Sequence, residues 1–216
     1  NKNILISCGG TVENIDDARA ITNLSSGKMG FSIAESAYAY GANVTLVCGR
    51  TDEKPPLGIK SFYASNHKTM KQVILEKVKN NDIFISVAAI SDYLPKVVLG
   101  KLKKKNTRIT LELEKSDDIL SEVSLNNENL FCVGFSAESE KIIKNSQDKL
   151  KNKKLDMIVA NSIKESMGKE SAEIYLIDHL GVTNIAKKSK KELSKDILKH
   201  IYKLVNTKGT IHDFID

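Results

Sequence analysis

The sequence lacks the features that mark several classes of protein. No apolar run approaches the ~18 residues of a membrane span, and no basic segment followed by an apolar one indicates a cleavable leader. Cys8, Cys48 and Cys132 stand singly in apolar runs without CxxC spacing, which predicts buried, reduced thiols. The four histidines have no ligand spacing, so neither a zinc site nor a histidine-based triad is supported. We expect a soluble, cytoplasmic protein without metal-binding side chains.

Aromatic residues are also scarce, at 6% of the chain. Lys and Arg number 33 against 27 Asp and Glu, a formal charge of +6, and lysines form runs at residues 101–105, 149–154 and 187–191. Without aromatic residues between them, these runs are more typical of solvated faces than of a nucleic-acid-binding module. A hydrophobic fraction of 41% over 216 residues is that of an ordinary globular domain.

Continuous apolar runs alternate with helical periodicity along most of the chain. The predicted strands are residues 3–8, 43–48, 59–64, 82–89, 130–135 and 155–160, and the predicted helices are residues 27–40, 68–79 and 138–150. This β-α-β alternation predicts an α/β fold, with a doubly wound, mostly parallel, Rossmann-like sheet. Ligands of such sheets bind beyond the carboxyl ends of the strands, so functional residues are expected in the loops that follow strands.

Residues 94–115 depart from this pattern. Residues 107–114 alternate apolar and polar side chains, which predicts a strand with one face in water. We interpret 94–115 as an excursion, either a flap over the site or a dimerisation arm. The end of the chain is predicted as a hairpin, a helix and a tail, at residues 172–178 with 182–186, 190–205 and 207–216. A single domain is expected over residues 1–206.

Glycines, hydroxyls and a lysine cluster after the first predicted strand. Gly9 and Gly10 end that strand, and residues 21–30 lead directly into the first helix. Free N–H groups at a helix N-terminus, with small residues around them, accommodate phosphate. Capping of the helix by Ser25 or Ser26 explains the same pattern. Both interpretations remain open at this point.

The common dinucleotide and P-loop signatures are absent. There is no GxGxxG, no GxxxxGK[ST] and no tyrosine with a lysine four residues later, but a short-chain NAD(P) reductase remains the alternative enzyme class. Asp92 follows a strand, where it would hold a ribose or a metal ion or would stabilise a turn. Lys149 and Lys153 lie one helical turn apart and could bind a polyphosphate together, with nucleic acid as the competing anion.

Five blocks in chain order resemble phosphopantothenoylcysteine synthetase, the phosphopantothenate–cysteine ligase, in its bacterial CTP-dependent form. These blocks are residues 3–30, 88–95, 101–104, 133–138 and 149–161. The resemblance extends to about residue 205 and implies a ligase of coenzyme A biosynthesis that joins 4′-phosphopantothenate to L-cysteine. In that family CTP converts the carboxylate to an acyl-cytidylate with release of pyrophosphate, and the cysteine amine then displaces CMP.

The resemblance also implies the site residues. Asn23 and Lys101 match the family's catalytic positions, Asn23 at the acyl-cytidylate and Lys101 in the K-x-K-K motif linked to activation and CTP use. The implied CTP-binding residues are Gly9, Gly10, Ala88, Ala89, Asp92, Lys101, Gly134, Phe135, Lys149 and Lys153. The implied phosphopantothenate-binding residues are Asn23, Ser25, Ser26, Gly27 and Lys28.

The resemblance and the phosphate chemistry also imply a cofactor and partners. Mg²⁺ is expected on the triphosphate. The family is dimeric, so an arm near residues 107–114 would place Lys101 in the partner's site. Bacterial members commonly carry a flavin-dependent decarboxylase in front, so a chain that begins at Asn1 fits a stand-alone synthetase or an excised domain. Two departures from the family pattern are mild, namely Ile90-Ser91 in place of Val-Ala and Ser139 in place of threonine.

Overall fold

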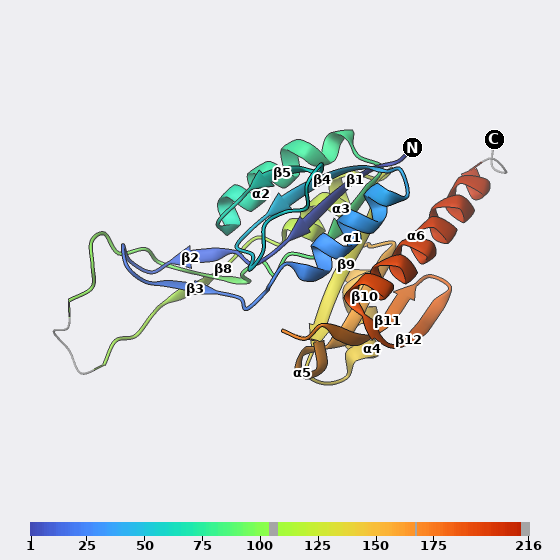
Figure 1. Ribbon diagram of the computed structural model, residues 1–216. Coiled ribbons are helices and arrows are strands. Elements are labelled where there is room, and N and C mark those ends of the chain that lie inside the picture. Colours follow the sequence, from blue (N-terminus) through green and yellow to red (C-terminus); the bar gives the residue numbers. More distant parts are fainter. Residues whose placement is uncertain (104–107, 167, 213–216) are drawn as a thin grey trace.

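A twisted eight-stranded sheet carries helices on both faces, and an arm projects from one end of it in the computed structural model (Figure 1). The structure describes residues 1–103, 108–166 and 168–212. The strand order is β12-β11-β10-β9-β6-β1-β4-β5. In chain order the strands are β1 (Asn3–Cys8), β4 (Asn43–Cys48), β5 (Lys60–Tyr63), β6 (Ile83–Ser86), β9 (Phe131–Glu138), β10 (Met157–Ser162), β11 (Ser171–Asp178) and β12 (Gly181–Ser189).

The winding of this sheet has two directions. From β1 the chain moves outward through β4 to β5, and it then returns to the other side of β1 and moves outward through β6, β9 and β10. Ile4 pairs with Val44 on one side and with Ile83 on the other, both in parallel register. Only β11 and β12 run antiparallel to their neighbours within the sheet. The predicted doubly wound, mostly parallel α/β fold is therefore confirmed.

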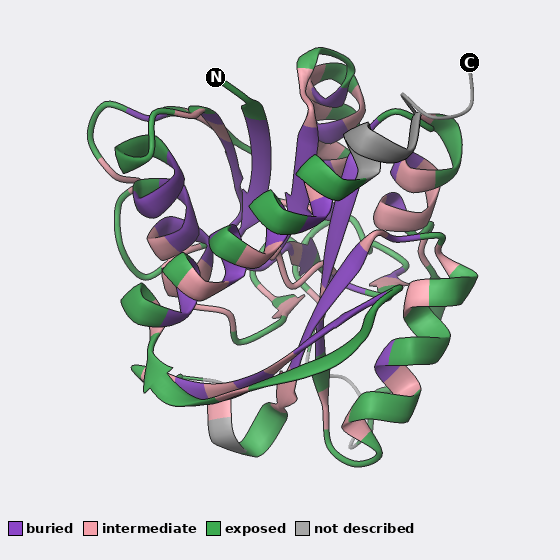
Figure 2. Cartoon of the chain, turned by 90° about the vertical axis from the view of Figure 1, so that its right-hand side faces the viewer, coloured by how far each residue is buried: buried purple, intermediate pink, exposed green. Residues whose placement is uncertain are grey.

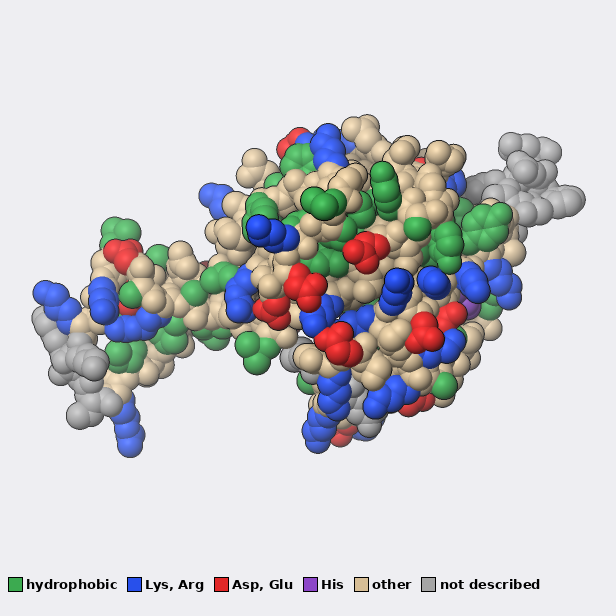
Figure 3. Space-filling view, in the orientation of Figure 1, with side chains coloured by type: hydrophobic (Ala, Val, Ile, Leu, Met, Phe, Trp, Pro, Cys, Tyr) green, Lys and Arg blue, Asp and Glu red, His purple; other side chains and the backbone are tan. Residues whose placement is uncertain are grey.

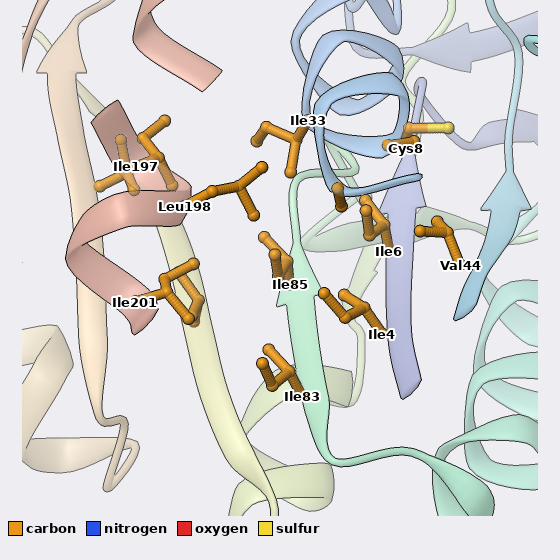
Figure 4. Packing of buried hydrophobic residues seen from close by; sticks show 14 of the residues in the cluster. Ile4, Ile6, Cys8, Ile33, Val44, Ile83, Ile85, Ile197, Leu198 and Ile201 are labelled. Carbon is orange, nitrogen blue, oxygen red and sulfur yellow. The ribbon is translucent and has the colours of Figure 1, made fainter. Parts of the chain in front are cut away.

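Two layers of helices cover the sheet and bury its central strands, whereas the edge strand β12 is exposed along most of its length (Figure 2). Helices α1 (Lys28–Ala39) and α6 (Lys190–His212) pack on the face that receives Ile4 and Ile6, as Figure 4 shows. Helices α2 (His67–Lys77), α3 (Ile119–Asn126) and α4 (Ile142–Asn152) pack on the face that receives Leu5. A short 3₁₀ helix (Val78–Asn80) and α5 (Ile163–Ser166) complete the elements of the domain body. Burial on both faces explains why the central strands are largely apolar.

The projecting arm consists of residues 12–22 and 93–115, with 104–107 outside the described residues. It contains one antiparallel pair, β2 (Val12–Asn14) with β3 (Ala20–Thr22), and a second, β7 (Tyr93–Pro95) with β8 (Leu113–Lys115). A backbone hydrogen bond of 2.9 Å from Val98 N to Ile15 O joins the two parts. The predicted strand over 107–114 is wrong for most of its length, because 108–112 have no regular structure and β8 begins at Leu113.

Other boundaries also differ from prediction. Strand β9 continues to Glu138 because it stays paired with β10 as far as Ser162, so α4 begins at Ile142 rather than at 138. Helix α6 continues to His212, past Val205, so much of the predicted tail at 207–216 is helical; residues 213–216 lie outside the described residues. The predicted end of α1 at Gly41 is confirmed, since this glycine adopts a φ of 85° directly after the helix.

Candidate active site

A cavity of about 510 Å³ lies at the carboxyl ends of the parallel strands, within the size range of small-molecule sites. It opens where the winding reverses, between β1 and β6, and is lined by Gly9 after β1 and by residues 86–92 at and after the end of β6. Doubly wound sheets bind ligands at this switch point because the loops from the two neighbouring strands diverge there. The predicted location of functional residues after strands therefore coincides with this cavity.

Gly9 and Gly10 shape the floor of this opening. Gly9 has a φ of 78°, which an L side chain rarely adopts. A Cβ on Gly10 would lie 2.7 Å from the backbone oxygen of Asn23. Gly10 exchanges backbone hydrogen bonds with Arg50 and does not itself line the cavity. The two glycines thus let the chain turn sharply and bring Asn23 to the cavity wall.

Asn23 joins the two loops at the switch point. Its Nδ2 donates to the backbone oxygens of Ala89, at 3.2 Å, and of Ile90, at 3.3 Å. The residue lines the cavity together with Ala88 and Ala89. Both contacts of the amide nitrogen are with backbone carbonyls, so Asn23 fixes the shape of the 88–92 loop in this structure.

The N-terminus of α1 forms one end of the cavity. Ser25, Ser26, Gly27 and Lys28 all line it. The N-cap is Gly27, with a φ of 81° and no side-chain cap hydrogen bond, but the hydroxyl of Ser26 accepts from the backbone N–H of Lys28 at 3.5 Å, so a serine does contact the first turn of the helix. This contact is at the long limit of a hydrogen bond. An anion that binds at the first turn of α1 would offer its N–H groups a better acceptor and would suit the helix dipole.

Lys28 is already paired in this structure. Its Nζ bonds to Glu170 Oε1 and lies 3.5 Å from Glu53 Oε1. The hydrogen bond with Glu170 raises the pKa of Lys28 above its ordinary value. The positive charge predicted for a phosphate at this end of the cavity is therefore partly engaged by two carboxylates.

Lys149 and Lys153 line the opposite wall, from α4 and its C-terminal end. Lys149 Nζ lies 2.6 Å from Glu138 Oε1, and Lys153 Nζ lies 2.7 Å from Asp118 Oδ2. Although partial burial opposes the shift, the hydrogen bond from Lys149 holds the pKa of Glu138 below its ordinary value. Each lysine is thus held by a carboxylate at the cavity wall, where a polyphosphate could take over the contact.

Residues 116–120 line the same wall, and the sequence analysis missed them. Asp118 caps α3 by accepting from Ser121 N at 3.0 Å. His67 Nε2 lies 2.9 Å from the backbone oxygen of Asp117, and Lys71 pairs with the Asp117 carboxylate at 2.6 Å. Two side chains of α2 therefore hold this loop. The D/N-x-x-S pattern of a helix cap at Asp118 was the available signal.

Most of the predicted site residues meet in this one cavity. Those that line it are Gly9, Asn23, Ser25, Ser26, Gly27, Lys28, Ala88, Ala89, Asp92, Phe135, Lys149 and Lys153. Gly134 does not line it; a Cβ there would lie 2.9 Å from Leu155 Cδ1, so this glycine serves the packing of the sheet against its helices. Lys101 does not line it either, because it lies on the arm.

Two further residues in the cavity were not predicted. Asn161 Oδ1 is buried and has no hydrogen-bond partner within the described part of the chain. Such an acceptor favours a ligand that donates a hydrogen bond. Lys190, the first residue of α6, also lines the cavity. Asn161 ends the recognised block at 149–161 but no role was assigned to it, whereas Lys190 lies outside all five blocks.

The arm is anchored next to Lys101 by a buried carboxylate. Asp16 Oδ2 accepts from Leu102 N at 3.0 Å and Oδ1 accepts from Ala18 N at 2.8 Å, while Arg19 Nη1 lies 3.2 Å from Oδ2. The hydrogen bonds from Ala18 and Leu102 hold the pKa of Asp16 below its ordinary value. The lowered pKa means that the anchor is intact above the ordinary Asp pKa and is lost only as pH falls through the lowered value.

We expect Asp16→Ala to speed hydrogen exchange at the Leu102 amide by about tenfold or more, because this N–H loses its acceptor. Exchange measured by mass spectrometry at neutral pH checks this result. Asp17→Ala is the matched control, since Asp17 is the exposed neighbour and should leave the Leu102 amide unchanged. Equal protection in wild type and Asp16→Ala would contradict the anchoring role.

The cysteines and histidines add no second site. The three cysteines are buried and free, as predicted. Cys8 Sγ lies 3.4 Å from Cys48 Sγ, and that hydrogen bond together with burial raises the pKa of Cys8, which makes it a poor nucleophile. Across the described residues, no group of three or more His, Cys, Asp or Glu side chains could hold a metal ion. No helix among these residues is long and apolar enough to cross a membrane.

The fold and the cavity define a class: a doubly wound α/β protein with a switch-point cavity lined by a helix N-terminus and lysines, suited to phosphorylated ligands. The chain belongs to the family described as the DNA/pantothenate metabolism flavoprotein C-terminal domain, which it matches over residues 1–205. This membership confirms the resemblance found in the sequence, since the matched relatives carry coenzyme A biosynthesis in their names.

Three relatives illustrate the family. The coenzyme A biosynthesis bifunctional protein CoaBC of Borreliella burgdorferi is 35% identical over 206 residues, and that of Vibrio vulnificus is 39% identical over 212 residues. These alignments cover 94% and 95% of this chain but 53% of each relative, so the chain spans about half the length of these curated relatives. A crystal structure of the C-terminal domain of a CoaBC protein matches with a TM-score of 0.84 and 34% identity, covering 96% of this chain and 97% of that one. None of these relatives is a nicotinamide reductase, so the reductase alternative is not supported.

Proposed function

We propose that this chain joins 4′-phosphopantothenate to L-cysteine, using CTP, in coenzyme A biosynthesis. A substrate carboxylate oxygen attacks the α-phosphorus of CTP, the bond to the β-phosphate breaks, and pyrophosphate leaves. The cysteine amine then attacks the acyl carbon of the acyl-cytidylate, the bond to the bridging oxygen breaks, and CMP leaves as the amine loses a proton. The observation that carries the proposal is the single cavity in which twelve of the implied site residues meet, in a chain of this family.

The described side chains suit the charges of this reaction. Two phosphorylated substrates bring several negative charges together, and an enzyme must offset this repulsion before the carboxylate can approach the α-phosphate. The N–H groups of α1 at one end of the cavity and Lys149 with Lys153 at the other provide positive charge in two places. Mg²⁺ would enter on the triphosphate, where it would offset charge on the phosphate oxygens. The exposed carboxylate of Asp92 on the cavity wall could add a ligand to it.

The decisive experiment is pyrophosphate release by the purified chain with 4′-phosphopantothenate and L-cysteine, in parallel with CTP and ATP. We expect release that requires 4′-phosphopantothenate and is faster with CTP. Pantothenate without the phosphate is the control and should give little release. Preference for ATP would contradict the interpretation that the Lys101 motif indicates use of CTP. No release with either nucleotide would contradict the proposed activity of this chain.

We further propose that the chain works as a homodimer in which the arm contacts the partner. Many of the arm's large apolar side chains are exposed in this single copy, and Lys and Arg side chains also gather along it (Figure 3). These apolar residues are Tyr93, Val97, Val98, Leu99, Ile109, Leu111 and Leu113. An exposed patch of this kind indicates a protein interface. A second copy covering it would bring Lys101 to the partner's cavity.

The relatives named above are bifunctional, and this chain matches about half of each. We propose that a flavin-dependent decarboxylase uses the product of this chain's reaction as its substrate. The decarboxylase would be either a joined domain or a separate protein. The flavoprotein name of the family supports this pairing.

A further inference from the structure

A cluster of four charged side chains closes the end of the cavity between α1 and α6. It consists of Lys28, Glu53, Glu170 and Lys190. Lys28 bonds to Glu170 and lies 3.5 Å from Glu53. A smaller cavity of about 300 Å³ lies against the cluster, and Lys28 and Lys190 line both cavities. The charges of two carboxylates and two ammonium groups thus balance beside the N-terminus of α1.

The two lysines of this cluster differ in what they can offer a ligand. Lys28 contacts both carboxylates, whereas Lys190 forms no ion pair within the described part of the chain. Lys190 is half-buried, and its backbone N–H donates to the backbone oxygen of Glu170 at 3.1 Å, which fixes the start of α6 at the cavity. Burial lowers the pKa of Lys190 below its ordinary value, with Glu170 opposing this shift. A nearby anion would favour the charged form of this ammonium group.

We propose that Lys190 supplies the cation that offsets the carboxylates of this cluster, so that a substrate phosphate can bind at the α1 end of the cavity. Without Lys190, the cluster would carry one net negative charge from Glu53 and Glu170 against Lys28, and it would repel a phosphate bound at the helix N-terminus. With Lys190, the carboxylates are balanced, and the α1 N–H groups can bind the phosphate without this repulsion. Lys190 thereby sets the affinity of this end of the cavity for phosphate.

This inference rests on the proposed function, which brings two phosphorylated substrates to one cavity. The shared chemistry is a phosphate group, and its source is either 4′-phosphopantothenate or the triphosphate of CTP. Separate titrations with the two compounds distinguish these sources. Inorganic pyrophosphate, as a third ligand, tests the phosphate contact without depending on either substrate.

The test is the dissociation constant of each of the three ligands, measured by calorimetry on the purified chain and on Lys190→Met. We expect Lys190→Met to weaken the binding of one substrate, and of pyrophosphate with it, by about tenfold to thirtyfold, because one uncompensated negative charge then lies close to the bound phosphate. Lys190→Arg keeps the charge and should stay within about threefold of wild type. Lys195→Met is the matched control, because Lys195 is an exposed lysine of the same helix that lines neither cavity, and its loss should change no affinity.

A charge-rescue variant separates this role from a structural one. Glu170→Gln combined with Lys190→Met removes one carboxylate with the ammonium and returns the cluster to a net charge of zero, so it should recover much of the lost affinity. A merely structural loss would not be rescued in this way, and thermal melts of all variants report on folding.

The outcomes are distinguishable. Unchanged affinity of Lys190→Met for all three ligands overturns the inference, and so does a loss that Glu170→Gln does not rescue. Weakened pyrophosphate binding in a protein that releases no pyrophosphate from CTP supports Lys190 and contradicts the proposed function. A wild-type protein that binds none of the three ligands contradicts both.

Discussion

Mixing Asn23→Asp subunits with Lys101→Ala subunits is expected to restore about a quarter of wild-type activity, although each variant alone is nearly inactive. Random exchange makes about half of the dimers mixed, and each mixed dimer holds one site with Asn23 from one copy and Lys101 from the other. The reason is the position of Lys101 on the arm, outside the cavity that Asn23 lines. Pyrophosphate release after subunit exchange measures this recovery.

Each single variant is expected to be nearly inactive for its own reason. Asn23→Asp would direct a carboxylate at the backbone oxygens of Ala89 and Ile90, where the amide now donates, and would distort the 88–92 loop. Lys101→Ala removes a positive charge from the activation step, and loss of one such electrostatic contact costs about 10²–10³ in rate.

The control for this experiment is a mixture in which both substitutions sit on one chain. Mixing that double variant with wild type leaves each mixed dimer with one Asn23 and one Lys101 on the same chain, so neither of its sites is complete if the arms cross. The opposite pattern, with no recovery from the two single variants, would place Lys101 in the site of its own subunit.

The parallel core was predictable because each buried strand is a short contiguous segment whose apolar composition is visible in the sequence. Strands buried on both faces need mostly apolar residues, and β1, β4 and β10 have them. The buried faces of α1 and α2 are likewise largely apolar. The arm was harder to predict. Strands β2 and β3 are three residues each, and 108–112 alternate apolar and polar residues without forming a strand. Side-chain alternation produces a strand only where a neighbouring strand offers hydrogen bonds, and the sequence does not report the neighbour.

The site also contains some residues that the sequence predicts and others that it does not. Asn23, Lys28 and Asp92 follow directly from strands or begin a helix, so their place at the carboxyl edge was predictable from the winding rule. Lys190 reaches the same cavity from the start of α6, after the antiparallel hairpin β11–β12 returns the chain to α1. The lysine run that contains Lys190 is typical of a solvated face. Only the tertiary contact with the Glu170 segment shows that Lys190 is half-buried.

Gly30→Ala is expected to destabilise the protein by about 2 kcal/mol and to lower the rate of pyrophosphate release by about a hundredfold. A Cβ at Gly30 would lie 2.4 Å from Cys8 Cβ, on the last residue of β1. Real carbon atoms of this kind do not approach so closely, so the N-terminal turn of α1 must move away from the sheet. The gain in helix propensity of alanine over glycine, about 1 kcal/mol, offsets part of the packing cost but does not restore the position. Urea denaturation and the pyrophosphate assay measure the two effects.

Gly41→Ala separates stability from site geometry in the same helix. Gly41 has a φ of 85° and nothing within 4 Å of an added Cβ, so alanine there should cost about 1 kcal/mol from backbone strain alone. Because this glycine follows the other end of α1, activity should stay near wild type. If both variants lost activity in proportion to their stability, the close approach at Gly30 would matter only for folding. If only Gly30→Ala loses activity, the missing side chain at Gly30 is what allows the N–H groups of α1 to reach the carboxyl edge of β1, where the phosphate must bind.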